Sequence, residues 1–409
     1  MPGQLSVFHA PPRSEHLQTM TITITFAEVV AAVIFCAVLL VALEVRRKHL
    51  TVWIGSYLNQ RVSRGRGIRL DEPIHIMFCL VDHFEPLSGP TSEAEGNRLR
   101  IWLEEYPKLA SRHKDSDGKP PQHSWFYPGE VYDAGCLETL TELARAGYGE
   151  VELHLHHAFD TPERLRGRLE TAVTNFVRHG ALVTNETQPQ ITYGFIHGNM
   201  GLNNSLGVGA CGVDNELPIL RDTGCYADFS MPTAPCRSQT RKINAIYYAK
   251  GIPGQPKSHD DGVDVELNRP PSGDLMIIQG PLAFNWTKRK YGILPRLENA
   301  EIQDSNPATP SRIRTWVAQH VHVKGRENWI MVKASCHGAE DRSRDAVLGD
   351  QADRMYRALE EEYRERPGYQ LHYVTARELY NIIKAAEAGM KGNPGLYRDY
   401  VIARYRNHP

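Results

Sequence analysis

The sequence predicts an α/β protein in which a parallel sheet closes into a (β/α) barrel, preceded by one transmembrane helix. Short apolar segments alternate with longer amphipathic ones along most of the 409 residues, which is typical of strands connected by helices. The number of these units favours a barrel over an open sheet. Near the N-terminus, residues 21–43 contain Glu28 as their single ionisable side chain.

The segment 21–43 is long enough to cross a hydrocarbon core of roughly 30 Å. We expect it to be retained, because a signal peptide has an apolar centre of about 7–15 residues and then a small-residue cleavage site. Arg13 precedes the segment, and four basic residues follow it: Arg46, Arg47, Lys48 and Arg61. Basic residues beside a span stay on the cytoplasmic side, so the larger C-terminal part is predicted to be cytoplasmic.

Five regions are expected along the chain. They are a short N-terminal tail (1–20), the transmembrane helix (21–43), a basic juxtamembrane linker (44–70), the barrel (71–390) and a C-terminal tail (391–409). Trp53 and Tyr57 in the linker are predicted to lie at the membrane interface. The 47 basic and 48 acidic residues give no reason to expect a nucleic-acid partner. Seven cysteines without paired spacing agree with a reducing compartment.

The first half of the barrel region begins with a nearly continuous apolar strand at 74–81, as expected for a strand covered on both faces. Predicted helices follow at 92–112 and 134–146, and a predicted strand at 150–156. Thr161 is placed as the N-cap of the next helix, with Pro162 at its first position. Its apolar face continues until Gly180.

The second half of the barrel region repeats this alternation. The predicted strands and helices are strands at 191–196, 225–231, 274–279 and 328–335, and helices at 214–223, 311–322 and 343–364. The Pro- and Gly-rich segment 250–273 is expected to be an inserted loop.

Polar residues follow several of these strands. They are Asp82, His83 and Glu85 after the first, His154, His156 and His157 after the second, His197 and Asn199 after the third, and His337, Glu340 and Asp341 after a late one. In a parallel barrel the carboxyl ends of the strands surround a common mouth. We therefore expect these side chains to converge there.

The histidine triplet at the second strand end is the most specific of these signals. Alternation along the strand puts Glu152, His154 and His156 on one face, and imidazoles grouped beside a carboxylate are what a divalent metal such as Zn²⁺ selects. A lone histidine such as His197 is more often a hydrogen-bonded surface or core residue than a ligand. The triplet therefore predicts a metal centre.

A metal held by two or three protein ligands keeps a position for water, lowers the pKa of that water towards about 7 and polarises a substrate carbonyl. A carboxylate then accepts the proton, and a histidine on the opposite side protonates the leaving group. Asp82 suits the first task. His337 suits the second, because it is distant in sequence but is expected at the same barrel mouth.

These residues are similar to the motifs of the polysaccharide deacetylase family, in particular its membrane- and exopolysaccharide-linked branch. "LVDHFEP" (80–86) resembles the motif in which an aspartate base precedes a metal-binding acid. "ELHLHH" (152–157) is similar to the histidine pair, and "CHGAED" (336–341) to the late histidine motif. The resemblance extends over about residues 72–385.

The resemblance implies an irregular, often seven-stranded (β/α) barrel that uses a divalent metal, usually zinc, to remove N- or O-acetyl groups from sugars. It implies an acetylated glycan substrate and a link to the polysaccharide biosynthesis machinery. The implied roles are Asp82 as the base, His337 as the acid, His197 and Asn199 as substrate-binding residues, and metal ligands drawn from His83, His154, His156 and His157.

The sequence departs from the family pattern at the ligands. His83 stands where the family has an acidic ligand, so His83, Glu85 or Asp82 itself completes the site. The family's histidine pair is four residues apart, but Ala158 is four residues after His154. At the third motif, "FIHGNMG" takes the place of the family's arginine and proline.

Two other functions remain open. The "HLH" tripeptide is also typical of amidohydrolase-type metal enzymes, although Asp82 before it and His337 after it fit that order less well. The other alternative is a degenerate, membrane-tethered barrel that only binds glycan. Its sugar-stacking surface would use exposed aromatic side chains, and the candidates are Trp125, Phe126, Tyr127 and Trp286.

Overall fold

A computed structural model describes residues 26–63, 66–69, 71–86, 92–183 and 190–405, without the side chains of 63 and 92–97. The chain forms two compact units, Met1–Arg46 and Arg47–Pro409. The first unit is described through helix α1 (Phe26–Arg47), whose last residue belongs to the second unit. The α/β sheet and the histidine clusters lie in the second unit.

Helix α1 has the length and composition of a membrane span. It contains 22 residues, its most apolar window has a mean hydropathy of 2.8, and none of its side chains is buried. The helix continues past Leu43 to Arg47, whereas the first five residues of the predicted span lie outside the described residues. A helix this close to the N-terminus also fits a signal sequence, and the side of the membrane stays a prediction.

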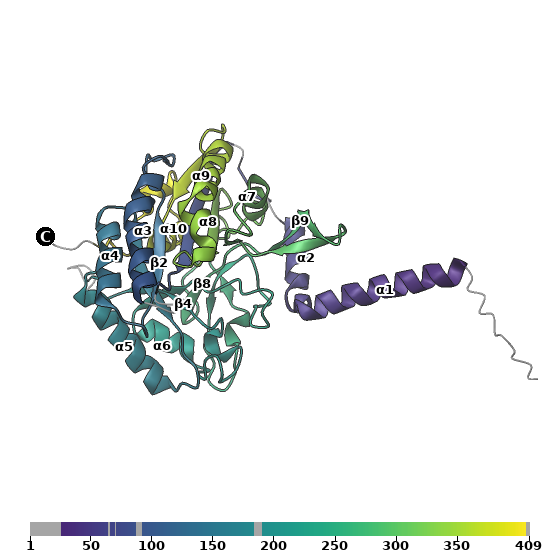
Figure 1. Cartoon of the computed structure of the whole chain (residues 1–409), viewed down its shortest axis with the longest axis horizontal. Helices are drawn as coiled ribbons and strands as arrows, with labels where there is room; N and C mark the ends of the chain where they lie inside the picture. The colour runs from purple at the N-terminus through teal and green to yellow at the C-terminus, as the bar shows by residue number, and fades with distance from the viewer. Residues whose placement is uncertain (1–25, 64–65, 70, 87–91, 184–189, 406–409) are drawn as a thin grey trace, which may run out of the picture. The chain divides into compact units, whose positions relative to one another are not determined.

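One large, mostly parallel sheet organises the second unit (Figure 1). Its strands follow the order β11-β12-β1-β2-β3-β4-β5-β8-β6-β7, and β13 also pairs with β1. The strands are β1 (Ile74–His83), β2 (His123–Pro128), β3 (Gly149–Leu155), β4 (Tyr193–His197), β5 (Cys225–Asp228), β6 (Ile246–Ala249), β7 (Val263–Asp264), β8 (Leu275–Ile278), β11 (Glu301–Ile302), β12 (Trp329–Cys336) and β13 (Tyr369–Tyr373). A separate antiparallel hairpin consists of β9 (Ala283–Lys290) and β10 (Leu294–Glu298).

The helices alternate with these strands largely as predicted. They are α2 (Ile54–Ser63), α3 (Ser92–Ala110), α4 (Ala134–Arg145), α5 (Pro162–Arg178), α6 (Glu216–Asp222), α7 (Pro310–Val317), α8 (Arg344–Leu348), α9 (Asp350–Tyr363) and α10 (Ala376–Glu387). The predicted cap of α5 is confirmed, because the Thr161 hydroxyl accepts a hydrogen bond from the Arg164 N–H and Pro162 begins the helix. The single helix predicted at 343–364 is divided at Gly349 into α8 and α9.

The sheet is not closed into a barrel. Strands β11 and β7 end the strand order and do not pair with each other. An irregular segment at 320–324 lies between β12 and the chain after β7: the Met331 N–H donates to the Val321 carbonyl, and the Leu267 N–H donates to that of Lys324. A closed barrel would need a continuous ladder of strand hydrogen bonds at this position, and only these isolated hydrogen bonds are present.

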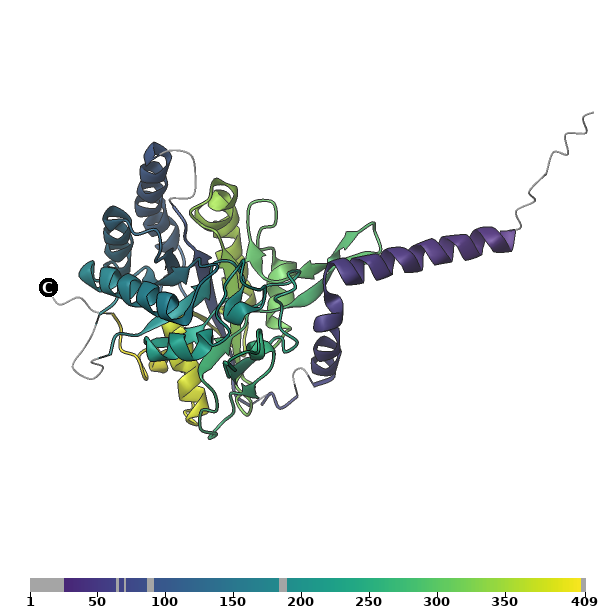
Figure 2. The same ribbon diagram turned by 90° about the horizontal axis from the view of Figure 1, so that it is seen from below.

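Alternation along β1 separates two hydrophobic cores. Ile76, Phe78 and Leu80 belong to the core beneath α3 and α9, whereas Met77 and Cys79 belong to the core shared with α10. In the view of Figure 2, α10 in yellow lies across the strands from α3 in blue. Successive side chains of a strand point to opposite faces. The two consecutive residues that end β1 are therefore directed to different faces of the sheet.

Three of the four aromatic residues proposed for sugar stacking are buried instead. Trp125, Phe126 and Tyr127 form the centre of β2, a strand that the sequence analysis did not identify, and all three are 0% exposed. Trp286 in the β9–β10 hairpin is 51% exposed. The predicted stacking surface is thus wrong for the first three residues, because they pack between neighbouring strands and helices.

The linker predicted at 44–70 also differs from its expected form. Trp53 is fully buried, and its ring stacks on Phe284 with centroids 5.3 Å apart. Tyr57 on α2 packs edge-on against Trp53 with centroids 5.9 Å apart. The predicted placement of both rings at the membrane interface is wrong, because contacts with the β9–β10 hairpin bury them.

Candidate metal centre

Five side chains from the ends of three strands come together in the second unit. His83 ends β1, Glu85 follows it, His154 and His156 belong to the end of β3, and His337 follows β12. The His83 ring stacks on that of His337 with centroids 4.7 Å apart, and it lies 5.0 Å from the His154 ring. The rings of His154 and His156 are 4.6 Å apart. We call these five residues the strand-end cluster.

Glu85 links the two halves of the strand-end cluster. Its Oε1 atom is 3.2 Å from His154 Nε2 and 3.6 Å from His156 Nε2. The potential ligand atoms of Glu85, His154 and His156 lie within 4.8 Å of one another, and the same is true of Glu85, His83 and His337. The cluster therefore presents one carboxylate and several imidazole nitrogens to a common space.

The surroundings of His83, which is half-buried, and of His154, which is fully buried, make both suitable for binding a metal. Burial, followed by the neighbouring imidazoles, holds the pKa of His83 well below its usual value. Burial also lowers the pKa of His154, and His154 Nδ1 has no hydrogen-bond partner among the described residues. Only a neutral imidazole binds a metal ion. The residues present therefore fit a divalent cation such as Zn²⁺.

Glu130 orients one of these imidazoles. Its Oε1 atom lies 2.6 Å from His156 Nδ1, which leaves Nε2 directed at Glu85. Burial lowers the pKa of His156, but the hydrogen bond and charge of Glu130 outweigh burial and raise this pKa overall. A carboxylate behind a ligating imidazole holds the ring and increases its basicity. This contact favours His156 as a ligand through Nε2.

Members of the strand-end cluster open onto two cavities. His83 and His337 line a cavity of about 520 Å³, together with Glu301 and the segment 229–236. Glu85, His156 and Glu130 line a smaller cavity of about 140 Å³. Sites for small molecules are typically about 300–1,000 Å³, so the larger cavity has the size of a substrate site.

Asp82, the predicted base, lies in a different group. Its Oδ2 atom is 2.8 Å from His123 Nε2, and its Oδ1 accepts a hydrogen bond of 2.6 Å from the Gly338 N–H. Asp82 is fully buried and shares a potential ligand group with His123 and Cys336. Strand alternation directs Asp82 to the face of Leu80, away from His83. The base role stays a prediction that no contact with the strand-end cluster supports.

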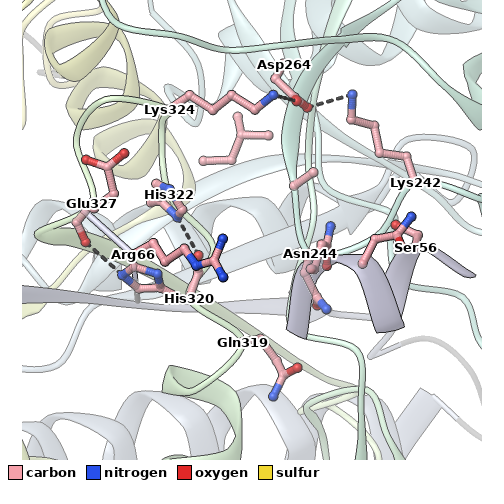
Figure 3. Close-up of a pocket in the computed structure, with 14 residues that line it drawn as sticks. Ser56, Arg66, Lys242, Asn244, Asp264, Gln319, His320, His322, Lys324 and Glu327 are labelled. Carbon is pink, nitrogen blue, oxygen red and sulfur yellow. Dashed lines mark hydrogen bonds and ion pairs between the residues drawn. The ribbon is translucent and has the colours of Figure 1, made fainter. Parts of the chain in front are cut away.

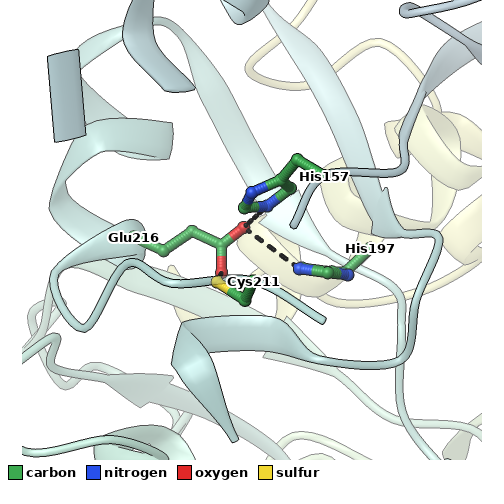
Figure 4. Close-up of side chains that lie close together, drawn as sticks. All are labelled: His157, His197, Cys211 and Glu216. Carbon is green, nitrogen blue, oxygen red and sulfur yellow. Dashed lines mark hydrogen bonds and ion pairs between the residues drawn. The ribbon is translucent and has the colours of Figure 1, made fainter. Parts of the chain in front are cut away.

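Two further predicted residues lie outside the strand-end cluster. His157 and His197 approach Glu216 and Cys211 in a separate group (Figure 4), and both histidines are buried. His197 therefore does not line the 520 Å³ cavity, although it was predicted to bind substrate. We call His157, His197, Cys211 and Glu216 the buried cluster.

Asn199, the other predicted substrate-binding residue, makes a structural contact. Its side-chain amide donates a 2.9 Å hydrogen bond to the His157 carbonyl. Its neighbours Gly198 and Met200 line the 520 Å³ cavity, whereas Asn199 does not. Its predicted role in holding substrate therefore remains a prediction.

Glu130 and Glu301 were missed by the sequence analysis. Glu130 lies two residues after the end of β2. If that strand had been predicted, Glu130 would have been a candidate site residue, because polar residues just after strands were expected to converge. Glu301 begins β11, a two-residue strand without a periodic signal. Its carboxylate approaches His337 Nδ1 to 4.0 Å, and this proximity depends on the pairing of β11 with β12.

Another cavity, of about 480 Å³, lies between α2 and the segment 319–327 (Figure 3). Lys242 Nζ is 2.6 Å from Asp264 Oδ1, and Lys324 is paired with the same carboxylate. Among the described residues, no potential metal-binding group lies in this cavity. The strand-end cluster is therefore the better candidate for a catalytic centre.

Comparisons with known proteins give little support for a family. No protein-family model matches the sequence, and no curated protein matches it either. Among solved structures, it is similar to that of a candidate polysaccharide deacetylase from Mycobacterium smegmatis, at 9% identity and a TM-score of 0.40. The match covers 79% of this chain and 94% of the other. Similarity this distant carries no argument about fold or activity.

Proposed function

We propose that the protein is a metal-dependent hydrolase that removes acetyl groups from a sugar or polysaccharide. The observation that carries this proposal is the strand-end cluster, in which Glu85 and four imidazoles gather beside a cavity of about 520 Å³. Imidazole and carboxylate donors are those that Zn²⁺ prefers. The cavity gives such an ion access to a substrate of the size of a small sugar.

Glu85, His154 and His156 are the proposed ligands, and this set of three leaves a coordination position for water. His83 lies beside the set, against His337, and is left out of it. A bound ion supplies polarisation of the acetyl carbonyl and a lower pKa for water. Glu130 fixes the His156 ring through its 2.6 Å contact with Nδ1. His157, predicted as a ligand of the same metal, is left out because its nearest carboxylates are Glu216 and Asp160.

His337 is the proposed general acid, because it lines the cavity and its side chain is 28% exposed. Water adds to the acetyl carbon, the bond from that carbon to the sugar nitrogen or oxygen breaks, and acetate leaves. His337 gives its proton to the departing amine or alcohol. Glu301, 4.0 Å from His337 Nδ1, is the proposed proton acceptor in place of Asp82.

Asp82 is proposed to position the loop that carries His337. Its carboxylate accepts the Gly338 N–H hydrogen bond, and Gly338 directly follows His337. A Cβ atom added at Gly338 would lie 2.2 Å from Asp82 Oδ2, so the loop approaches the carboxylate too closely for any other residue. Removal of this contact would displace the acid without touching the ligands.

Helix α1 is proposed to anchor the hydrolase in a membrane. A cytoplasmic orientation would give it lipid-linked or nucleotide-linked precursors from the polysaccharide biosynthesis machinery, and the opposite orientation would give it finished polymer. A reporter fused to the C-terminus, active on one side of the membrane only, decides between these two cases.

The function is tested by acetate release from N- and O-acetylated sugars by the full chain in detergent. We expect activity to disappear on chelation and to return with Zn²⁺. The variant His337→Gln should lose about 100- to 10,000-fold in kcat, because it removes general acid catalysis, while its metal content stays unchanged. Metal-free preparations that still bind acetylated glycan would instead identify a degenerate binding protein.

A further inference from the structure

The buried cluster brings together four side chains from four segments of the chain (Figure 4). His157 follows β3, His197 ends β4, Cys211 lies in the loop before α6, and Glu216 begins α6. Each of the four is at most 3% exposed. No member of the cluster lines the 520 Å³ cavity. These four residues therefore have no role in the proposed hydrolysis.

The donor atoms of the buried cluster are spaced like the ligands of one tetrahedral ion. Glu216 Oε1 is 3.0 Å from His157 Nε2 and 3.8 Å from His197 Nε2, and Cys211 Sγ is 3.5 Å from Glu216 Oε2. Zinc bonds of about 2.0–2.1 Å to nitrogen or oxygen and about 2.3 Å to sulfur place tetrahedral ligands about 3.3–3.6 Å apart. Small side-chain adjustments would therefore complete the site.

His197 supplies an independent indication of a missing ligand. Its Nε2 atom is fully buried and has no hydrogen-bond partner among the described residues. The distance of 3.8 Å to Glu216 Oε1 is too long for a hydrogen bond. Buried polar atoms without a partner are rare and ask for an explanation. A cation between His197 and Glu216 would provide one. Its binding requires the ring proton on Nδ1, which would give up the long 3.4 Å hydrogen bond that this atom accepts from the Gly201 N–H.

A buried carboxylate faces His157 Nδ1, without a hydrogen bond between them. His157 Nδ1 is 3.5 Å from Asp160 Oδ2, and its Nε2 points at Glu216. Asp160 is in turn paired with Arg164 at 3.0 Å and Arg168 at 3.3 Å. A carboxylate behind an imidazole is the usual outer partner of a metal-binding histidine.

We propose that His157, His197, Cys211 and Glu216 form a structural zinc site, distinct from the strand-end cluster. A site with four protein ligands has no position left for water or substrate, which is the arrangement of structural rather than catalytic zinc. Zinc also favours a ligand set that mixes thiolate, imidazole and carboxylate. Binding replaces the thiol proton of Cys211 with the ion and releases that proton to solvent.

This site would hold the end of β3 in place for the strand-end cluster. His156 and His157 are adjacent in the chain, and a Cβ atom added at Gly198 would lie 2.4 Å from the His156 ring. An ion that binds both His157 and His197 would therefore fix the chain just after β3 and just after β4, and these two segments position His156. The proposal does not depend on the hydrolase function, because it rests on a different set of donors.

Cobalt substitution tests the site in the full chain in detergent. A thiolate bound to Co²⁺ gives an intense ligand-to-metal charge-transfer band, which imidazole and carboxylate ligands do not give. The strand-end cluster contains no cysteine, so a band that depends on Cys211 reports on the buried cluster alone. We expect this band once Co²⁺ has entered the site, and elemental analysis should find one more zinc per chain in the wild type than in Cys211→Ala.

Three variants make the result specific. Cys211→Ala should lose the band and one equivalent of metal, whereas Cys211→His should lose the band but keep the metal. Cys336→Ala is the matched control, because Cys336 belongs to the Asp82 group, and it should keep both. His154→Ala should lose only the strand-end ion. A wild-type chain without a Cys211-dependent band would overturn the proposal, even if the hydrolase activity were present.

Discussion

The strand-end cluster and the buried cluster use similar donors but differ in access to solvent. His83 and His337 line a cavity, whereas the four donors of the buried cluster are closed off. His156 and His157 are consecutive, yet one points at Glu85 and the other at Glu216. The comparison teaches that burial and free space around the donors, rather than their identity, separate a reactive site from a structural one.

The largest effect is expected for Glu85→Ala. Glu85 belongs to both halves of the strand-end cluster, and a bound ion contributes several kcal/mol to catalysis. Acetate release should therefore fall by roughly 1,000-fold or more. Elemental analysis should show the loss of the strand-end ion, and the cobalt–thiolate band should persist. Loss of that band as well would mean that the two clusters are one coupled site.

A pair of variants compares the two candidate bases. Glu301→Gln should lower kcat by about 100-fold with an unchanged unfolding temperature, because proton transfer is lost from a partly exposed side chain. Asp82→Asn should mainly destabilise the protein, because it disturbs the buried contact with His123, whereas its amide oxygen can still accept the Gly338 N–H hydrogen bond that positions His337. Steady-state kinetics and thermal unfolding measure both effects. If Glu301→Gln were fully active and Asp82→Asn were stable but inactive, Asp82 rather than Glu301 would be the base.

A smaller effect is expected for Glu130→Gln. The amide still fills the space but loses the charge that holds His156, and such outer-shell changes cost about 10- to 100-fold in metal affinity or activity. Zinc titration of the apo protein measures the change in affinity. Glu138→Gln is a suitable control, because the exposed Glu138 makes a similar contact with a histidine, His179, outside the strand-end cluster. Equal affinities of wild type and Glu130→Gln would argue against His156 as a ligand.

Removal of the structural ion should change stability rather than chemistry. In buffer with zinc, Cys211→Ala should unfold about 5 °C below the wild type, because the folded state loses a ligand-linked contribution. A chelator should abolish this difference by removing the ion from the wild type. A difference that persists in chelator would indicate that only packing was disturbed.

The smallest effect concerns Glu152, on β3 below His154. Burial raises its pKa to about 8, despite hydrogen bonds from Tyr226 and from the Gly194 N–H. The folded state therefore retains this proton at a pH where the unfolded state has lost it. Stability from this group is complete below about pH 4.5 and is lost as pH rises towards 8. Glu152→Gln should reduce the decline in unfolding free energy from pH 5 to 8 by roughly 1–3 kcal/mol, as measured by urea denaturation.

Local pattern predicted several elements correctly. The apolar run of α1, the buried strand β1 and the Thr161–Pro162 start of α5 all follow from periodicity and capping, which act over a few residues. The strand β2 was missed because its short aromatic run has no clear alternation. Because β2 was missed, Glu130, which follows this strand and contacts His156, was missed as well.

Sequence alone determined that histidines and carboxylates follow the strands of a parallel sheet. Tertiary structure alone decided which of them meet. It directed Asp82 away from His83, separated His157 from His156, and brought Glu301 towards His337 through the pairing of β11 with β12. The physical reason is range: alternation and capping act between near neighbours, whereas the convergence of donor atoms depends on strand order, on loop paths and on an open sheet edge that no local pattern encodes.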